Sequence, residues 1–175
     1  GVERIAHGAI FVAMVVAVPV GIAAAIFSSE FAPPRLKEVL KPVIELLAGI
    51  PSVVLGFFAL VVLATWLQDG FGFTSRLNAV TAGLALALTI IPVVFTVSED
   101  ALTAVPRSFR EASLALGATR WETAFRVVLP AAAPGVLAAV VLGFGRAIGE
   151  TMIVLMASGN AAQTTWSFGD SIRTL

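Results

Sequence analysis

The segment Glu111–Pro130, with the sequence EASLALGATRWETAFRVVLP, divides a chain that otherwise consists of long apolar runs. It is the longest amphipathic, charged interruption between those runs. In a chain of this pattern the apolar runs lie in a membrane and the charged interruption lies at its surface. The position of this segment therefore decides how the rest of the chain is arranged.

The same region carries the signals of two short helices joined by a tight turn. Residues Ser108–Leu116 predict the first helix, and Gly117 suits the left-handed residue that ends it. Thr119 and Glu122 have the spacing of a capping box, which predicts the start of a second helix. We therefore expect a helix, a glycine turn and a second helix lying at the membrane surface.

The composition is that of a polytopic membrane protein. Of the 175 residues, 58% are hydrophobic and 13% are charged, whereas ordinary soluble domains are about 45–50% apolar and about 25% charged. The eleven basic and eleven acidic residues balance, so the net charge does not indicate what kind of partner the protein has, and it gives no sign of nucleic-acid binding. The sequence contains no cysteine, which excludes a disulfide framework and a thiolate metal site.

Four apolar stretches are long enough to cross a hydrocarbon core about 30 Å thick as helices of about 20 residues. These stretches are Ala9–Phe27, Ile44–Leu67, Ala79–Val97 and Pro134–Ala157. Almost no polar face is left over, which argues against buried helices of a soluble protein. We therefore predict an all-α fold, a bundle of about four transmembrane helices with the loop 98–133 outside the bilayer.

Glycine and proline inside these stretches are compatible with transmembrane helices, because neighbouring groups can satisfy the backbone atoms that they leave free. We expect Pro51, in the second stretch, to set a kink or a small hinge within one span. We expect Pro130 and Pro134 to punctuate the junction between the charged loop and the fourth span.

Basic residues near the ends of the stretches predict the orientation of the chain. Seven lie in the loops Ser28–Val43 and Ser98–Ala133, namely Arg35, Lys37, Lys41, Arg107, Arg110, Arg120 and Arg126. Only Arg4, Arg76 and Arg173 flank the spans on the other side. Because positively charged loops stay in the cytoplasm, both loops are predicted to be cytoplasmic in a multi-pass protein of the cytoplasmic membrane. The N-terminus, the loop 68–78 and the tail after Ser158 are predicted to lie outside.

Two groups of charges near these loops are interpreted as structural. Lys37, Lys41 and Glu45 recur at four-residue spacing and can pair along one helix face. Glu99 and Asp100 lack the further ligands that a metal site needs. No metal site is therefore predicted.

The spacing within the charged segment resembles a family signature. The pattern reads Glu111-Ala112-Ser113, three residues, Gly117, nine residues, Val127 and then Leu129-Pro130. It resembles the EAA motif of ABC-importer permeases, with Ser113 in place of alanine and Val127 in place of isoleucine. The resemblance implies a type I ABC importer permease fold and a coupling helix that docks into a groove of a cytoplasmic ATPase. Glu111, Ala112 and Gly117 would be contact positions.

Two further stretches resemble phosphate importer permeases of the Pst type. They are SSEFAPPRLKEVLKPVIELLAGIPSVVLGFFAL (residues 28–60) and LGFGRAIGETMIVLMASGNAA (residues 142–162). The stretch GETMIVLMASGN is nearer the PstC-type subunit than its PstA-type partner. The resemblance runs from Pro19 onward and implies a further N-terminal helix and a last helix after Leu175, so the chain is expected to be a fragment.

The resemblance also implies the partners. They are a dimer of cytoplasmic ABC ATPases that binds ATP and Mg, a second permease subunit in a heterodimer, and an extracytoplasmic phosphate-binding protein. The sequence contains no GxxxxGK[ST] motif, so ATP hydrolysis is expected on a separate chain. This chain is accordingly expected to be no enzyme and to bind no cofactor of its own.

Arg146 and Glu150 are charges inside the fourth predicted span. They stand four residues apart and therefore on one helix face. A charge at that depth costs at least about 2.5–3.5 kcal/mol, so it normally faces a partner or a water-filled path. Either Arg146 lends positive potential to an anion path that Glu150 moderates, or the two form a salt bridge that only pins helices together. Gly145 and Gly149 form a small-xxx-small pair that would admit close packing by a neighbouring helix.

Besides a phosphate permease there are three alternatives, of which the first is of the same class and the other two are of different classes. A permease for another oxyanion or small solute is compatible with the same residues. An intramembrane enzyme would need paired catalytic groups at membrane depth. Glu150 is the single acid there, because Glu45 stands at the very edge of its stretch, and the spans hold no histidine. A membrane scaffold or sensor anchor that transports nothing is the third. The residues alone do not select phosphate; the resemblance does.

Overall fold

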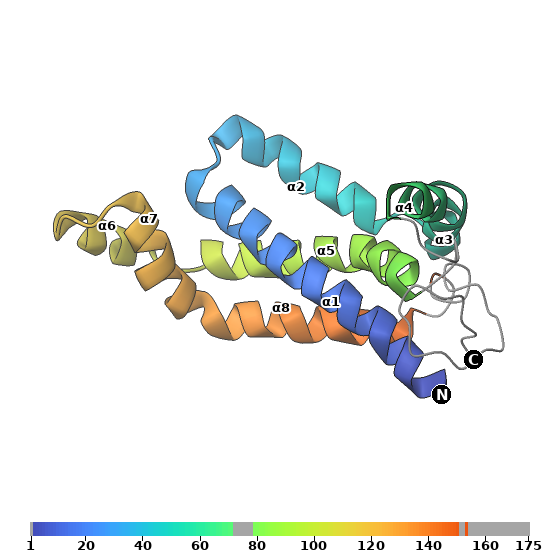
Figure 1. Cartoon of the computed structure of the whole chain (residues 1–175). Helices are drawn as coiled ribbons and strands as arrows, with labels where there is room; N and C mark the ends of the chain where they lie inside the picture. Colours follow the sequence, from blue (N-terminus) through green and yellow to red (C-terminus); the bar gives the residue numbers. More distant parts are fainter. Residues whose placement is uncertain (1, 72–78, 151–152, 154–175) are drawn as a thin grey trace. The chain divides into compact units, whose positions relative to one another are not determined.

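The computed structural model describes residues 2–71, 79–150 and 153 of the chain. Helices are the only regular elements within these residues (Figure 1). In chain order they are α1 (Val2–Ile26), η1 (Phe27–Phe31), α2 (Pro34–Ala48), α3 (Ser52–Phe58), η2 (Ala59–Leu63), α4 (Ala64–Phe71), α5 (Ala79–Thr103), α6 (Arg107–Ala115), α7 (Arg120–Thr123), η3 (Ala124–Val128) and α8 (Leu129–Gly149). The elements η1, η2 and η3 are π-helical turns. The predicted all-α fold is confirmed for the described part of the chain.

Three continuous helices among the described residues are long and apolar enough to cross a membrane. They are His7–Phe31, Val80–Thr103 and Arg120–Gly149. The first two coincide with the first and third predicted spans. The third contains the start of the fourth predicted span, whose remaining residues are described only at Glu150 and Ile153. Most of the loop 68–78 and the whole tail after Ser158 also lie outside the described residues.

The second predicted span, Ile44–Leu67, is not one helix. The helix α2 ends at Ala48 and α3 begins at Ser52, so the chain breaks at residues 49–51. Pro51 adopts an extended conformation, with φ −58° and ψ 136°, immediately before α3. A proline has no N–H to continue a helix and disfavours the α conformation in the residue before it. Pro51 therefore does not kink one span but separates two helices. The two segments are long and apolar enough to cross a membrane only when they are taken together.

The junction before the fourth span also differs from the prediction. The chain is helical without interruption from Arg120 to Gly149, through α7, η3 and α8, so neither Pro130 nor Pro134 separates the loop from the span. In η3 the N–H of Leu129 bonds to the carbonyl of Ala124, five residues earlier. This wider turn directly precedes Pro130, where the helix lacks a donor. A π-turn therefore takes the place of the predicted break.

Two compact units make up the chain, and each has its own core. The first comprises Gly1–Ala17, Gly49–Ile90 and Phe144–Leu175. Its described core holds mostly small side chains, namely Ala9, Ala59, Ala82, Ala85 and Ile153. A Cβ placed on Gly83 of α5 would lie 2.8 Å from the carbonyl oxygen of Ala9 in α1. Small residues thus bring α1 and α5 into backbone contact here, as is common between transmembrane helices.

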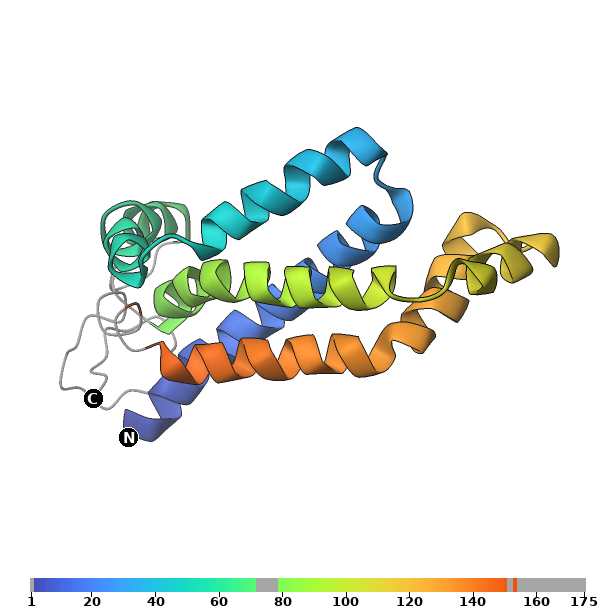
Figure 2. The same cartoon turned by 180° about the vertical axis from the view of Figure 1, so that it is seen from behind.

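The second unit comprises Val18–Ala48 and Ile91–Gly143. Its core comes from α1, α5, η3, α8 and the connection after α5, and it includes several large side chains. Its members are Ala25, Ile26, Phe95, Leu102, Val105, Val128, Ala132 and Val136. Leu40 and Ile44 of α2 pack against this core. Within this unit, η1 and the hairpin formed by α6 and α7 lie toward the C-terminal end of α5 (Figures 1 and 2). The two predicted cytoplasmic loops are therefore close together.

Apolar side chains are also abundant on the surface. On α8, Leu137, Val141 and Ile148 are each more than half exposed. Exposed apolar faces of this extent are typical of helices that contact lipid or other subunits.

Candidate functional site

The candidate site is the hairpin of α6 and α7 that precedes the fourth span. The helix α6, Arg107–Ala115, agrees to within one residue at each end with the predicted helix Ser108–Leu116. It starts after Pro106, whose ψ of 140° is extended, because a proline suits the first turn of a helix but not its interior. Pro106 therefore separates the hairpin from α5.

The turn of the hairpin is a Schellman motif centred on Gly117. Gly117 has φ +86°, a conformation that glycine adopts without steric cost. Its N–H donates to the carbonyl of Leu114 at 3.0 Å, and the N–H of Ala118 donates to the carbonyl of Ser113 at 3.2 Å. These are the two hydrogen bonds that define the motif. The prediction of a left-handed residue at Gly117 is confirmed.

The second arm begins with the predicted capping box. The N–H of Glu122 donates to Oγ1 of Thr119 at 3.2 Å, and the N–H of Thr119 donates to Oε2 of Glu122 at 2.9 Å. Each side chain thus satisfies an amide that the first turn of a helix leaves without a partner. The prediction is confirmed, and the direction of the second arm is set locally.

A hydroxyl pair fastens the two arms to each other. Oγ of Ser113 lies 2.9 Å from Oγ1 of Thr123, which is buried. Ser113 is the position at which the EAA motif usually has alanine, so here the substitution adds a hydrogen bond across the hairpin. Sequence inspection missed this contact because Thr123 belongs to no motif.

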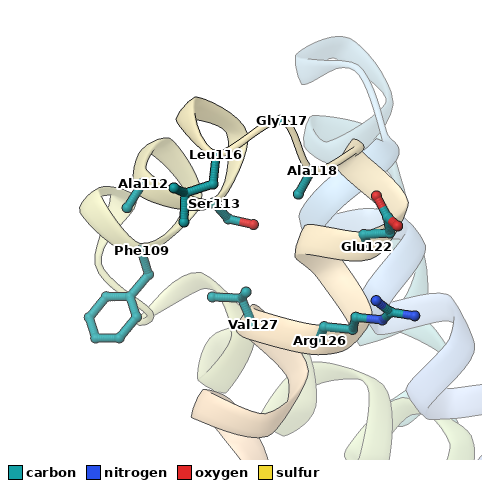
Figure 3. Close-up of a pocket in the computed structure, with 9 residues that line it drawn as sticks. All are labelled: Phe109, Ala112, Ser113, Leu116, Gly117, Ala118, Glu122, Arg126 and Val127. Carbon is teal, nitrogen blue, oxygen red and sulfur yellow. The ribbon is translucent and has the colours of Figure 1, made fainter.

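A groove opens between the arms (Figure 3). It has a volume of about 610 Å³, and its lining comprises Phe109, Ala112, Ser113, Leu116, Gly117, Ala118, Glu122, Arg126 and Val127. Leu116, at the tip, is 90% exposed, and Phe109 is about half exposed. Large apolar side chains are seldom left in water around a preformed hollow without a partner. The groove is therefore a candidate surface for docking another protein.

The predicted coupling residues divide between this groove and other places. Ala112, Ser113 and Gly117 line the groove. Glu111 faces a second, polar pocket of about 390 Å³, whose lining includes Ser29, Glu30, Lys37, Thr103, Arg107 and Arg110. Leu129 packs against the core of the second unit, and Pro130 is exposed in the first turn of α8. The motif residues therefore lie partly in the groove and partly where the hairpin meets the neighbouring helices.

Arg146 and Glu150 are not paired in the structure. Arg146 lies in the last turn of α8, which ends at Gly149, and Glu150 is the first residue beyond that helix. Within residues 2–71, 79–150 and 153, no ion pair joins the two side chains. The Nε of Arg146 is buried and has no hydrogen-bond partner there. Arg146 thus has an unsatisfied donor within the described part of the chain, and the roles of Arg146 and Glu150 stay predictions.

Gly145 and Gly149 do not pack another helix among the described residues. No atom of this part of the chain lies within 4 Å of a Cβ placed on either glycine. Close packing at these positions by a neighbouring helix stays a prediction.

Two ion-pair clusters were not predicted. Lys41 binds Glu99 at 3.2 Å and Asp100 at 2.7 Å on α5 instead of pairing with Glu45 along its own helix. Arg110 binds Glu30 at 2.7 Å. Both connect residues more than 50 positions apart in the chain, so local spacing carried no signal for them. In the part of the chain that the structure describes, no group of three histidine, aspartate or glutamate side chains could hold a metal ion.

Comparison with known proteins identifies the family. Residues 17–171 match the family model described as binding-protein-dependent transport system inner membrane component. The chain is 47% identical to the probable ABC transporter permease protein YqgH of Bacillus subtilis, over 91% of this chain and 52% of that protein. It is 36% identical to the phosphate transport system permease protein PstC of Pasteurella multocida, over 86% and 53% of the two chains.

A third relative is the phosphate transport system permease protein PstC 2 of Mycobacterium tuberculosis, which is 37% identical over 90% of this chain and 55% of that protein. The chain thus spans about half the length of the curated relatives that it matches. The hairpin with the EAA-like spacing and the apolar helices Val80–Thr103 and Arg120–Gly149 lie wholly inside the matched region, and His7–Phe31 lies partly inside it. The chain therefore belongs to the family of binding-protein-dependent transport system inner membrane components, and within it resembles ABC permeases of the PstC type.

Proposed function

We propose that the chain is part of a permease subunit of an ABC importer that moves inorganic phosphate across the cytoplasmic membrane. ATP is hydrolysed on a separate pair of ABC ATPases. The observation that carries the proposal is the preformed hairpin of α6 and α7, with its exposed apolar groove, in a chain that belongs to the permease family. The names of the PstC relatives support phosphate as the substrate.

The hairpin is suited to transmit force because its shape is set by its own residues. The Schellman turn, the capping box and the Ser113–Thr123 hydroxyl pair all lie within the hairpin. A preorganised element loses little conformational freedom on docking, so more of the contact energy is available for binding. The ATPase would bind the groove around Leu116 and Ala112, and the hairpin would follow its movements.

Arg146 is the proposed contributor to the anion path. It is a cation in an apolar helix, with a buried Nε that no described residue satisfies. A cation in a membrane span normally faces a water-filled path or a partner. A second permease subunit would complete that path, and Glu150, just beyond the end of α8, would moderate the potential.

The proposed orientation places η1, the start of α2 and the hairpin in the cytoplasm. The basic residues of both loops support it, and so does the ion pair that joins the loops. An extracytoplasmic phosphate-binding protein would deliver the anion on the opposite side.

Reconstitution tests the function. The complete transporter, with its ATPases and partner permease, is placed in proteoliposomes, and uptake of phosphate and sulfate is measured with and without ATP. We expect ATP-dependent uptake of phosphate in preference to sulfate. Preferential uptake of another solute would support a permease with a different substrate. ATP hydrolysis without any uptake would support a scaffold or sensor.

A further inference from the structure

Arg110, which precedes the predicted coupling residue Glu111 on α6, reaches across to η1. Its Nη2 donates to Oε1 of Glu30 at 2.7 Å, and its Nε donates to Oε2 at 3.1 Å. The side chains of Arg110 and Glu30 are only 21% and 10% exposed. A two-point arginine–carboxylate pair fixes geometry as well as distance, and enclosure reduces its screening by salt. This pair therefore differs from an ordinary surface salt bridge.

The same guanidinium also closes the end of α5. Nη1 donates to the carbonyl oxygen of Val105 at 2.6 Å, and Nη2 donates to that of Leu102 at 2.9 Å. Carbonyl groups at the C-terminus of a helix have no partner within the helix, and an arginine placed there satisfies them and interacts favourably with the helix dipole. Arg110 thus attaches the first turns of α6 to both η1 and α5.

An aromatic contact attaches the second arm of the hairpin to the same place. The ring centroid of Phe31 lies 5.6 Å from that of Trp121, which in turn lies 4.5 Å from that of Phe125. These separations are typical of favourable aromatic pairs. Glu30 and Phe31 are neighbours in η1, so each arm of the hairpin holds one residue of a single π-helical turn. Such turns occur frequently at functional sites.

We infer that η1, Arg110 and Trp121 form a joint through which the hairpin moves as one body with the adjoining ends of α1 and α5. Because both arms are attached to η1, one arm cannot move relative to the other by bending at Gly117. A displacement of the hairpin therefore also displaces η1. Arg110 is then a positioning residue for coupling and contacts neither ATP nor the transported anion. The inference rests on the proposed function, because the joint has a use only if an ATPase moves the hairpin.

The first test compares solute uptake with ATP hydrolysis in proteoliposomes that contain the complete transporter. Arg110→Gln removes the charge that holds Glu30, and we expect phosphate uptake per ATP hydrolysed to fall roughly fivefold or more, while the complex assembles. Arg110→Lys keeps the charge without the planar fork and is expected to lie between wild type and Arg110→Gln. Arg107→Gln is the matched control. It removes a cation from the same helix at an exposed side chain that makes no ion pair among the described residues, and we expect unchanged coupling.

Charge reversal separates coupling from a simple loss of stability. Glu30→Arg alone opposes two arginines and should abolish most coupling. The double variant Glu30→Arg/Arg110→Glu restores a pair of opposite polarity, and we expect it to regain part of the uptake per ATP. Recovery is partial because a glutamate cannot donate to the carbonyls of Leu102 and Val105. The inference is overturned by any of three results. They are normal coupling by Arg110→Gln, a loss in Arg110→Gln no larger than that in Arg107→Gln, and no recovery of coupling in the double variant.

A distance measurement tests the joint independently of the transported solute. The sequence has no cysteine, so spin labels can be attached to cysteines introduced at two exposed positions, Ala23 in α1 and Ser108 in α6. We expect one narrow distance distribution with and without ATP, and a broadened one in Arg110→Gln. If the wild type shows this behaviour but imports no phosphate, the proposed function fails and the joint stands. A broad distribution in the wild type, or no effect of Arg110→Gln, overturns the joint.

Discussion

Replacement of Gly117 by valine is the most direct test of the hairpin. Gly117 has φ +86°, and beyond its own chain neighbours no atom of the described residues lies within 4 Å of a Cβ placed on it. Valine there would meet no steric clash with neighbouring groups, so the whole cost comes from the backbone conformation. A left-handed conformation costs an ordinary residue about 1–2 kcal/mol, and a β-branched residue lies at the upper end of that range. This cost lowers the population of the observed turn by a factor of roughly 5–30.

The assay measures three quantities in the complete transporter: assembly with the ATPase, ATP hydrolysis, and phosphate uptake. We expect Gly117→Val to insert normally, because the apolar helices are unchanged, but to lose uptake per ATP or ATPase docking. Gly117→Asn is the matched control. Asparagine adds a side chain of similar size yet tolerates the left-handed region, so we expect a much smaller loss.

The pair of variants separates conformation from size. Equal losses in Gly117→Val and Gly117→Asn would show that any side chain obstructs the docked partner and that the turn conformation is not the cause. Normal uptake and normal assembly by Gly117→Val would refute the assignment of the hairpin as the coupling element.

Three further predictions concern other parts of the chain. Thr119→Ala removes the cap and should destabilise the second arm by about 1 kcal/mol, which faster hydrogen exchange at the amide of Glu122 would reveal; unchanged exchange would contradict the role of the cap. Gly83→Ala places a Cβ 2.7 Å from Cβ of Val12 and should cost about 1–3 kcal/mol by overpacking, seen as a lower melting temperature in detergent. Gly145→Ala, whose Cβ would meet no neighbouring group among the described residues, should not lower it. Arg146→Gln removes a charged donor worth about 1.5–3 kcal/mol to an anion, so uptake should fall about tenfold or more in a normally assembled complex. Unchanged uptake by that variant would exclude Arg146 from the path.

The best-predicted part of the chain is the hairpin. Its first helix, its left-handed glycine and its capping box were all predicted from spacing alone, and all three are present. Each depends on hydrogen bonds between residues at most five positions apart, as between Ser113 and Ala118. Interactions of this range are encoded by the order of residues, and surrounding helices do little to alter them.

Proline was the main source of error in the predicted helices. Pro51 was expected to bend a span and instead separates α3 from α2, while Pro130 and Pro134 were expected to mark a junction and instead lie inside α8. The same residue type therefore ends a helix in one place and is accommodated in another. At Pro130 the helix continues through the π-turn of η3, which no residue pattern predicts.

The sequence by itself determined the helical class of the chain, the position of its apolar stretches and the shape of the hairpin of α6 and α7, because length, composition and short-range hydrogen bonds suffice for these. Tertiary structure alone decided which charges meet. Lys41 pairs with Glu99 and Asp100, which are 58 and 59 residues away, and not with Glu45 on its own helix. Arg110 pairs with Glu30, which is 80 residues away. Such pairs depend on which helix ends lie side by side, and that follows from packing of the cores, which spacing along the chain does not encode.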